Sequence, residues 1–142
     1  MEQRLSLITL GVASLDRART FYEELGWHGQ EVQETVFIQA GGIALVLWGR
    51  EQLADDAGIK DTHADGFGGI ALAHNVRHEH EVDEVLASAR DAGGTITQPA
   101  RKTSYGGYAG CFADLDGHCW EIAYNPGFPL NADGSITIPQ FS

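Results

Sequence analysis

The stretch that decides the fold is Phe112-Ala113-Asp114-Leu115-Asp116-Gly117-His118-Cys119-Trp120-Glu121-Ile122-Ala123-Tyr124-Asn125-Pro126. Residues 109–113 and 118–124 are predicted to be antiparallel strands, because segment 114–117 has the acidic, glycine-ending pattern of a turn and Pro126 cannot continue a ladder. Side chains alternate along a strand, so the outgoing strand has two different faces. One face is bulky and consists of His118, Trp120, Ile122 and Tyr124. The other carries Glu121 between Cys119 and Ala123, so Glu121 points either to bulk water or to the floor of a cleft.

The overall composition is that of one globular α+β domain. The chain has 142 residues, 18 glycines and a formal net charge of -11. Nucleic acids and anionic membranes bind cationic surfaces, so the charge argues against both as partners and permits a cationic ligand. The start of the chain lacks the apolar run of a signal peptide, and no segment approaches the roughly 20 apolar residues of a membrane span. We therefore expect a cytoplasmic protein in which Cys111 and Cys119 are reduced thiols.

The first part of the chain follows a strand–helix–strand–strand–strand pattern. Ser14 is a suitable helix N-cap, apolar residues then recur at helical spacing, and Gly26 is a suitable terminator. The predicted strands of this part are 7–12, 27–32, 35–40 and 43–48.

The second part repeats the pattern. It has a predicted strand over 69–76, a helix through 82–89 that stops at Gly93-Gly94, a short strand over 95–98, and the closing hairpin. We divide the single domain, 1–142, into module one at about 5–49, a linker at 50–66 with one short helical turn, module two at about 67–128, and a tail at 129–142 with a strand-like segment at 135–138.

The sharpest internal match sets residues 42–48 beside 117–123, which makes Val46 and Glu121 equivalent. By the same reading, Leu7 and Gly69 occupy equivalent places on the opening strands. Two such βαβββ modules are expected to form a curved mixed sheet around an open cleft.

The motifs resemble those of the vicinal-oxygen-chelate superfamily, the group of glyoxalase I, bleomycin-resistance proteins and extradiol dioxygenases. The resemblance rests on the Phe-Tyr-x-x-Leu-Gly helix ending at 21–26 and on Asp-x-Asp-Gly-His-x-Trp-Glu at 114–121, within a match over about 5–129. Leu115 stands where the family pattern usually has Pro. The resemblance implies a homodimer with a cleft shared between subunits, although the two modules could also complete a cleft alone.

In metal-using members of the family, the resemblance places four ligands at the positions of Leu7, Val46, Gly69 and Glu121. Only Glu121 has a donor atom, and one carboxylate does not hold a divalent transition metal against water. We therefore expect no metal, no other cofactor, and no glyoxalase I or dioxygenase activity. The histidines offer no replacement: His78 and His80 lie at a solvated helix start, His74 faces its helix, and His63 and His118 have no evident partner.

Two functions are compatible with these residues. The first is a binding protein that holds a small organic molecule, possibly a cation, without chemistry. Its predicted ligand contacts are Thr9, Trp48, Tyr105, Tyr108, Cys119 and Glu121. The alternative is a metal-independent isomerase or lyase on a small carbonyl compound, with Glu121 as general base. A purely structural domain is disfavoured, because small side chains around Glu121 leave space that a structural core would fill.

Overall fold

The structure is a computed structural model that describes residues 1–62 and 66–141. The chain forms two compact units, one before Phe67 and one from Phe67 onward, and each contains one of the predicted βαβββ modules. Among the described helices, none combines the length and the hydrophobicity needed to cross a bilayer.

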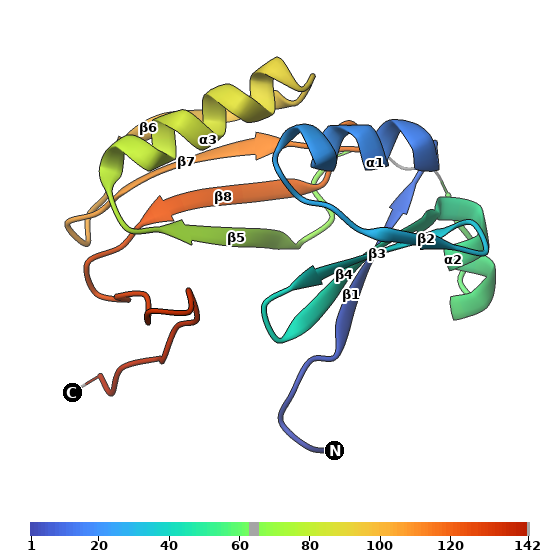
Figure 1. Ribbon diagram of the computed structural model, residues 1–142, viewed down its shortest axis with the longest axis horizontal. Helices are drawn as coiled ribbons and strands as arrows, with labels where there is room; N and C mark the ends of the chain where they lie inside the picture. Colours follow the sequence, from blue (N-terminus) through green and yellow to red (C-terminus); the bar gives the residue numbers. More distant parts are fainter. Residues whose placement is uncertain (63–65, 142) are drawn as a thin grey trace. The chain divides into compact units, whose positions relative to one another are not determined.

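Module one contains a four-stranded mixed sheet with one helix (Figure 1). Its elements are β1 (Leu7–Val12), α1 (Leu15–Glu24), β2 (Gln30–Val32), β3 (Thr35–Ala40) and β4 (Ile43–Gly49). The strand order is β1-β4-β3-β2, with β1 parallel to β4 and the other pairs antiparallel.

Module two repeats this topology. Its elements are β5 (Ala71–Val76), α3 (Glu79–Asp91), β6 (Thr95–Lys102), β7 (Tyr108–Ala113) and β8 (Cys119–Tyr124). The strand order is β5-β8-β7-β6, and β5 is parallel to β8. Helix α3 lies over this sheet (Figure 1). The predicted duplication and the α+β class are confirmed.

The helix boundaries follow from capping chemistry. The Ser14 hydroxyl accepts a hydrogen bond from the Arg17 N–H at 3.3 Å, which begins α1 as predicted. The Trp27 N–H then donates to the Tyr22 carbonyl at 2.9 Å around Gly26, whose φ is +89°. This is the closure that glycine favours after a helix, and the Gly94 N–H donates to the Ala89 carbonyl in the same way after α3.

Each sheet buries one face against its own helix. In module one, Phe21 and Tyr22 of α1 are each 1% exposed, and their rings meet edge to face. In module two, Leu86 of α3 is buried above the sheet, where Phe112 and Trp120 stack with centroids 6.1 Å apart. These apolar contacts supply the main stabilisation of both modules.

Several boundaries differ from the prediction. The predicted strand 27–32 is shortened to β2, because the chain is still closing α1 at Trp27. The segment 50–66 contains a longer helix than one turn, α2 (Arg50–Ala57), which Gly58 ends with φ +68°. Strand β6 passes Pro99, because register shifts on either side of Gln98 remove the need for a regular ladder there.

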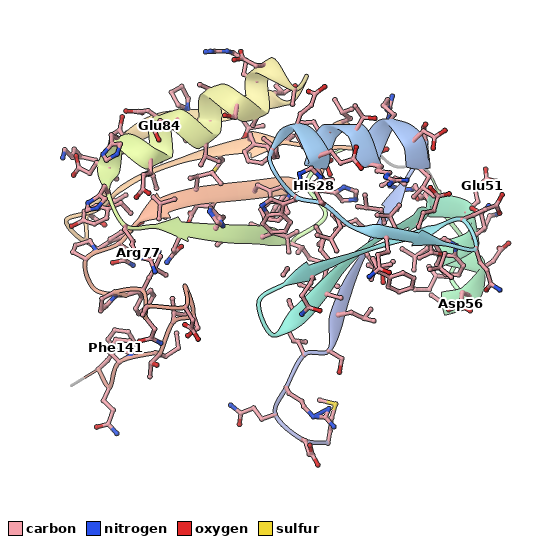
Figure 2. The ribbon with its side chains drawn as sticks, viewed as in Figure 1. His28, Glu51, Asp56, Arg77, Glu84 and Phe141 are labelled. Carbon is pink, nitrogen blue, oxygen red and sulfur yellow. The ribbon has the colours of Figure 1, made fainter. Side chains whose placement is uncertain are left out.

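The tail forms no strand in its described part, although residues 135–138 were predicted to be strand-like. Instead, the Asn131 N–H donates to the Ser135 carbonyl at 2.8 Å and closes a loop. The guanidinium of Arg77, at the end of β5, donates to the Asn131 carbonyl at 2.7 Å (Figure 2). The tail is therefore tied to module two.

Candidate functional site

The two faces of the module-two sheet can be assigned from Gly110. A Cβ built on Gly110 would lie 2.6 Å from Leu86 Cδ1, so this position points at α3. Gly110 pairs with Ile122, and neighbouring residues point the opposite way. Glu121 therefore lies on the face that points away from α3, as predicted for a residue opposite Trp120 and Ile122. We call this surface the Glu121 face; the residues used below are Ala73, Arg101, Ala109, Cys111, Cys119 and Glu121.

The Glu121 carboxylate is half-buried at the centre of this face. Its cross-strand partners are Ala73 on β5 and Cys111 on β7, neither of which carries an opposite charge. Across residues 1–62 and 66–141, no hydrogen bond or ion pair reaches its side chain. A partly desolvated carboxylate without a partner lowers stability, and its oxygen atoms are available to a ligand.

Cys111 and Cys119 are free thiols that lie beside Glu121. Burial raises the pKa of Cys111, and the neighbouring Cys119 and Glu121 raise it further, whereas Arg101 opposes the shift. Cys111 is therefore a protonated thiol at neutral pH and a poor nucleophile.

Arg101 belongs to the same face and was missed by the sequence analysis. It is the register partner of Ala109 on β7, whose side chain shares a face with Cys111, and its charge acts on the Cys111 thiol. The sequence analysis ended this strand at Gln98, directly before Pro99. A β-bulge at Pro99 would have allowed the predicted strand to continue to Arg101.

The predicted ligand contacts do not all gather on this face. The Tyr108 hydroxyl donates to Asp83 of α3 at 2.8 Å, a bond that raises the pKa of Tyr108. Tyr108 thus lies on the side of the sheet opposite Glu121, and its role as a ligand contact stays a prediction. Tyr108 and Gly110 are two residues apart on β7, so the alternation of side chains along the strand predicts that both positions face α3.

The remaining predicted contacts belong to other elements. Tyr105 is 49% exposed in the turn between β6 and β7. Thr9 and Trp48 belong to module one, where Thr9 pairs with Val46 and Trp48 pairs with Gly11. Of the six predicted contacts, only Cys119 and Glu121 lie on the Glu121 face.

The structure also corrects one equivalence. Val46 pairs with Thr9, whereas Glu121 pairs with Ala73. Ala73 is thus the counterpart of Thr9, and the counterpart of Leu7 is Ala71 and not Gly69. Gly69 lies before β5 with φ +80°, a conformation that an extended strand does not use.

The donor set does not fit the metal that the resemblance implies. Leu7, Val46 and Gly69 carry no donor atom, and replacing Gly69 by its corrected counterpart Ala71 adds none. No group of three or more His, Cys, Asp or Glu side chains within the described ranges is arranged to hold a metal ion. No step of the chemistry below is assigned to a metal.

His118 has a partner that the sequence analysis did not find. Its Nδ1 lies 2.8 Å from Asp114 Oδ2. Asp114 Oδ1 accepts hydrogen bonds from the backbone N–H groups of Asp116, at 2.9 Å, and His118, at 2.8 Å. The Asp114 side chain is only 2% exposed. This dyad closes the hairpin turn and so holds β7 and β8 in register beneath Glu121. His63 lies outside the described residues, while His78 and His80 are exposed at the start of α3, as expected.

Comparison with known proteins gives the family. The model of the Glyoxalase/Bleomycin resistance protein/Dioxygenase superfamily matches residues 4–122. A solved structure of a glyoxalase-related enzyme from Fulvimarina pelagi is 41% identical, with 96% of this chain and 98% of that chain covered and a TM-score of 0.88. No curated protein matches the chain.

More distant structures share the fold alone. A glyoxalase/bleomycin resistance protein/dioxygenase family enzyme from Burkholderia phytofirmans has a TM-score of 0.75 at 15% identity, with 84% of this chain and 96% of that chain covered. A lactoylglutathione lyase from Agrobacterium tumefaciens has a TM-score of 0.64 at 18% identity, with 87% and 94% covered.

Proposed function

The chain belongs to the Glyoxalase/Bleomycin resistance protein/Dioxygenase superfamily, and we propose that it binds a small organic molecule on the Glu121 face without a bound metal ion. The observation that carries the proposal is the half-buried Glu121 carboxylate, which has no hydrogen-bond partner in the described chain. A ligand that donates an N–H or O–H to this carboxylate would supply the missing bond.

Charge and packing support a ligand with a cationic or hydroxyl group. The net charge of -11 attracts cations from solution, and a charge-assisted hydrogen bond to a carboxylate is stronger than a neutral one. Ala73 next to Glu121 has a small side chain, which suits a ligand on this face. Thr9, Trp48 and Tyr105 stay predictions as ligand contacts.

The test is a thermal-shift and calorimetric titration of the full chain against small amines, amino alcohols, cationic antibiotics, aldehydes and ketones. At least one class is expected to raise the melting temperature, because a ligand that binds only the folded state stabilises it. Glu121→Gln is expected to weaken binding by tenfold or more. Glu84→Gln, which removes a carboxylate that is 69% exposed on α3 (Figure 2), is the matched control. Equal binding by the Glu121→Gln and control variants would contradict the proposal.

A second candidate function is a metal-independent isomerase or lyase on a small carbonyl compound. It is favoured by the same free carboxylate, because a general base must have an oxygen available for the proton it removes. Glu121 would take a proton from the carbon beside the carbonyl, and the electron pair would move onto the carbonyl oxygen as an enolate. The enolate would be reprotonated at a neighbouring carbon or would expel a leaving group.

Proton exchange separates the enzyme from the binding protein. Each carbonyl compound that raises the melting temperature would be incubated with the protein in D2O and followed by NMR. Deuterium incorporation beside the carbonyl that Glu121→Gln abolishes and Glu84→Gln preserves would establish the base. Binding of a carbonyl compound without deuterium incorporation would instead support a binding protein that performs no chemistry.

We also propose a cytoplasmic homodimer. The free thiols Cys111 and Cys119 suit a reducing compartment, and the family resemblance suggests the dimer. Light scattering of the purified chain tests the oligomeric state, and a mass near 15.3 kDa would contradict a dimer.

A further inference from the structure

Arg101 stands out among the arginines of this acidic protein. Of its seven arginines, it is the one without a hydrogen bond or ion pair in the described residues. The other six, which have partners, are Arg4, Arg17, Arg19, Arg50, Arg77 and Arg90. The chain has 20 Asp and Glu residues, and none of the described ones forms an ion pair with Arg101.

Arg101 and Glu121 lie on the same face of the sheet, diagonally across β7. Arg101 on β6 pairs with Ala109, whereas Glu121 on β8 pairs with Cys111, so two strand spacings and an offset of two residues along the strands separate them, about 12 Å between backbones. The two side chains form no ion pair with each other. Both charges act on the pKa of the Cys111 thiol, in opposite directions.

This separation suits one small molecule with two different ends. A guanidinium has a planar fork of donors that matches a carboxylate or phosphate, whereas a carboxylate accepts from an ammonium or hydroxyl group. A molecule a few bonds long would satisfy both ends and span the alanines and thiols between them.

We propose that Arg101 and Glu121 together select a small molecule that carries an anionic group, a carboxylate or a phosphate, at one end and an ammonium or hydroxyl group at the other. The inference rests on the proposed binding function and specifies its ligand class. Arg101 is the specificity-determining residue for the anionic end.

The test uses four probes of similar length on the full 15N-labelled chain, with dissociation constants from amide shifts at constant ionic strength. 4-Aminobutanoate has both ends, n-butylamine lacks the anion, butanoate lacks the donor, and 3-aminopropyl phosphate replaces the carboxylate by a phosphate. The wild type is expected to bind 4-aminobutanoate or 3-aminopropyl phosphate at least tenfold more tightly than n-butylamine. The tighter of the two identifies the anionic group.

Arg101→Gln is expected to remove this tenfold preference and to leave n-butylamine binding unchanged. Arg101→Lys keeps the charge without the fork and is expected to retain part of the preference. Arg90→Gln, which removes the same charge from α3, is the matched control and is expected to behave as the wild type.

A wild type that binds the one-ended and two-ended probes equally, or binds none of them, would overturn the inference. So would a preference that survives in Arg101→Gln. These outcomes are distinct from failure of the proposed function, which would appear as n-butylamine binding that Glu121→Gln does not change.

Discussion

Modules one and two share one topology and use the sheet face away from their own helix in opposite ways. In module one, Val46 is 3% exposed on this face, and α2 packs beside it, since a Cβ on Gly11 would lie 3.2 Å from the Cα of Arg50. In module two, the equivalent position is Glu121, which is half-buried and has no partner in the described chain. The same backbone thus supports a buried apolar side chain at this position in one module and a half-buried charged one in the other.

The register extends this comparison residue by residue. Leu47 and Ile122 are equivalent and buried, and their antiparallel partners are Val36 and Gly110. Their parallel partners are Leu10 and His74. Module two therefore carries a glycine and a histidine where module one has ordinary core residues, and each difference can be tested by exchange.

The largest expected effect follows from moving the charge into module one. Val46→Glu would bury a carboxylate without a partner and is expected to lower the free energy of unfolding by about 4 kcal/mol at pH 8. The loss should be smaller at pH 5, because the protonated carboxyl is cheaper to bury. Urea denaturation at both pH values measures it.

The matched control is Leu7→Glu, since Leu7 is 49% exposed on the same face of module one. It is expected to change stability by less than about 0.5 kcal/mol.

The reciprocal exchange, Glu121→Val, is expected to stabilise the chain by about 1 kcal/mol and to abolish ligand binding. Destabilisation by Glu121→Val would show that the carboxylate has a structural role.

The next effect concerns the face toward the helix. Gly110→Val gives module two the residue that module one has at Val36, but the new atoms would meet Leu86 Cδ1 at 2.6 Å and the Ala100 backbone at 3.0 Å. Overpacking of this kind is expected to lower stability by about 3 kcal/mol. Gly42→Val, with no atom within 4 Å of its Cβ, is the control in thermal denaturation. Equal effects of the two variants would mean that α3 has more room than the structure indicates.

A smaller loss is expected from the hairpin turns. The β3–β4 turn of module one uses Gly41 and Gly42, whereas Asp114 holds the β7–β8 turn through three hydrogen bonds. Asp114→Ala leaves the N–H groups of Asp116 and His118 without this acceptor and is expected to cost about 2 kcal/mol. Asp133→Ala, in the exposed tail loop, is the control. Chemical denaturation of both variants would reveal whether module two needs its carboxylate.

The smallest effect is a pH dependence confined to module two. Burial lowers the pKa of His74, and the charge of Glu81 opposes this shift. Because the unfolded chain then takes up a proton more readily than the folded one, stability falls as the pH drops through about 6.5. His74→Leu, the residue at the equivalent Leu10, should remove this loss, which we expect to be below about 1 kcal/mol.

The measurement is the difference in unfolding free energy between the wild type and His74→Leu from pH 8 to pH 5. His80→Leu, at an exposed position of α3, is the control. A difference that does not change with pH would contradict a proton-linked contribution of His74.

Much of the fold was predictable because its signals are local. The caps at Ser14 and Gly26, the hairpin around residues 114–117, and the alternation that separates Glu121 from Trp120 depend on neighbouring residues only. The strand register was harder. Gly69 looked like a strand residue, and Pro99 looked like a strand end, because a sequence pattern does not reveal a positive φ or a bulge.

The sequence by itself determined the repeated module, the order of its helix and strands along the chain, and the isolation of one acidic side chain among small residues. Only the tertiary structure decided that Arg101, Cys111 and Glu121 share a face, that Tyr108 belongs to the other one, and that Asp114 holds His118. The reason is physical: periodicity and capping act over a few residues, whereas the pairing of strands brings together residues that are distant in the chain.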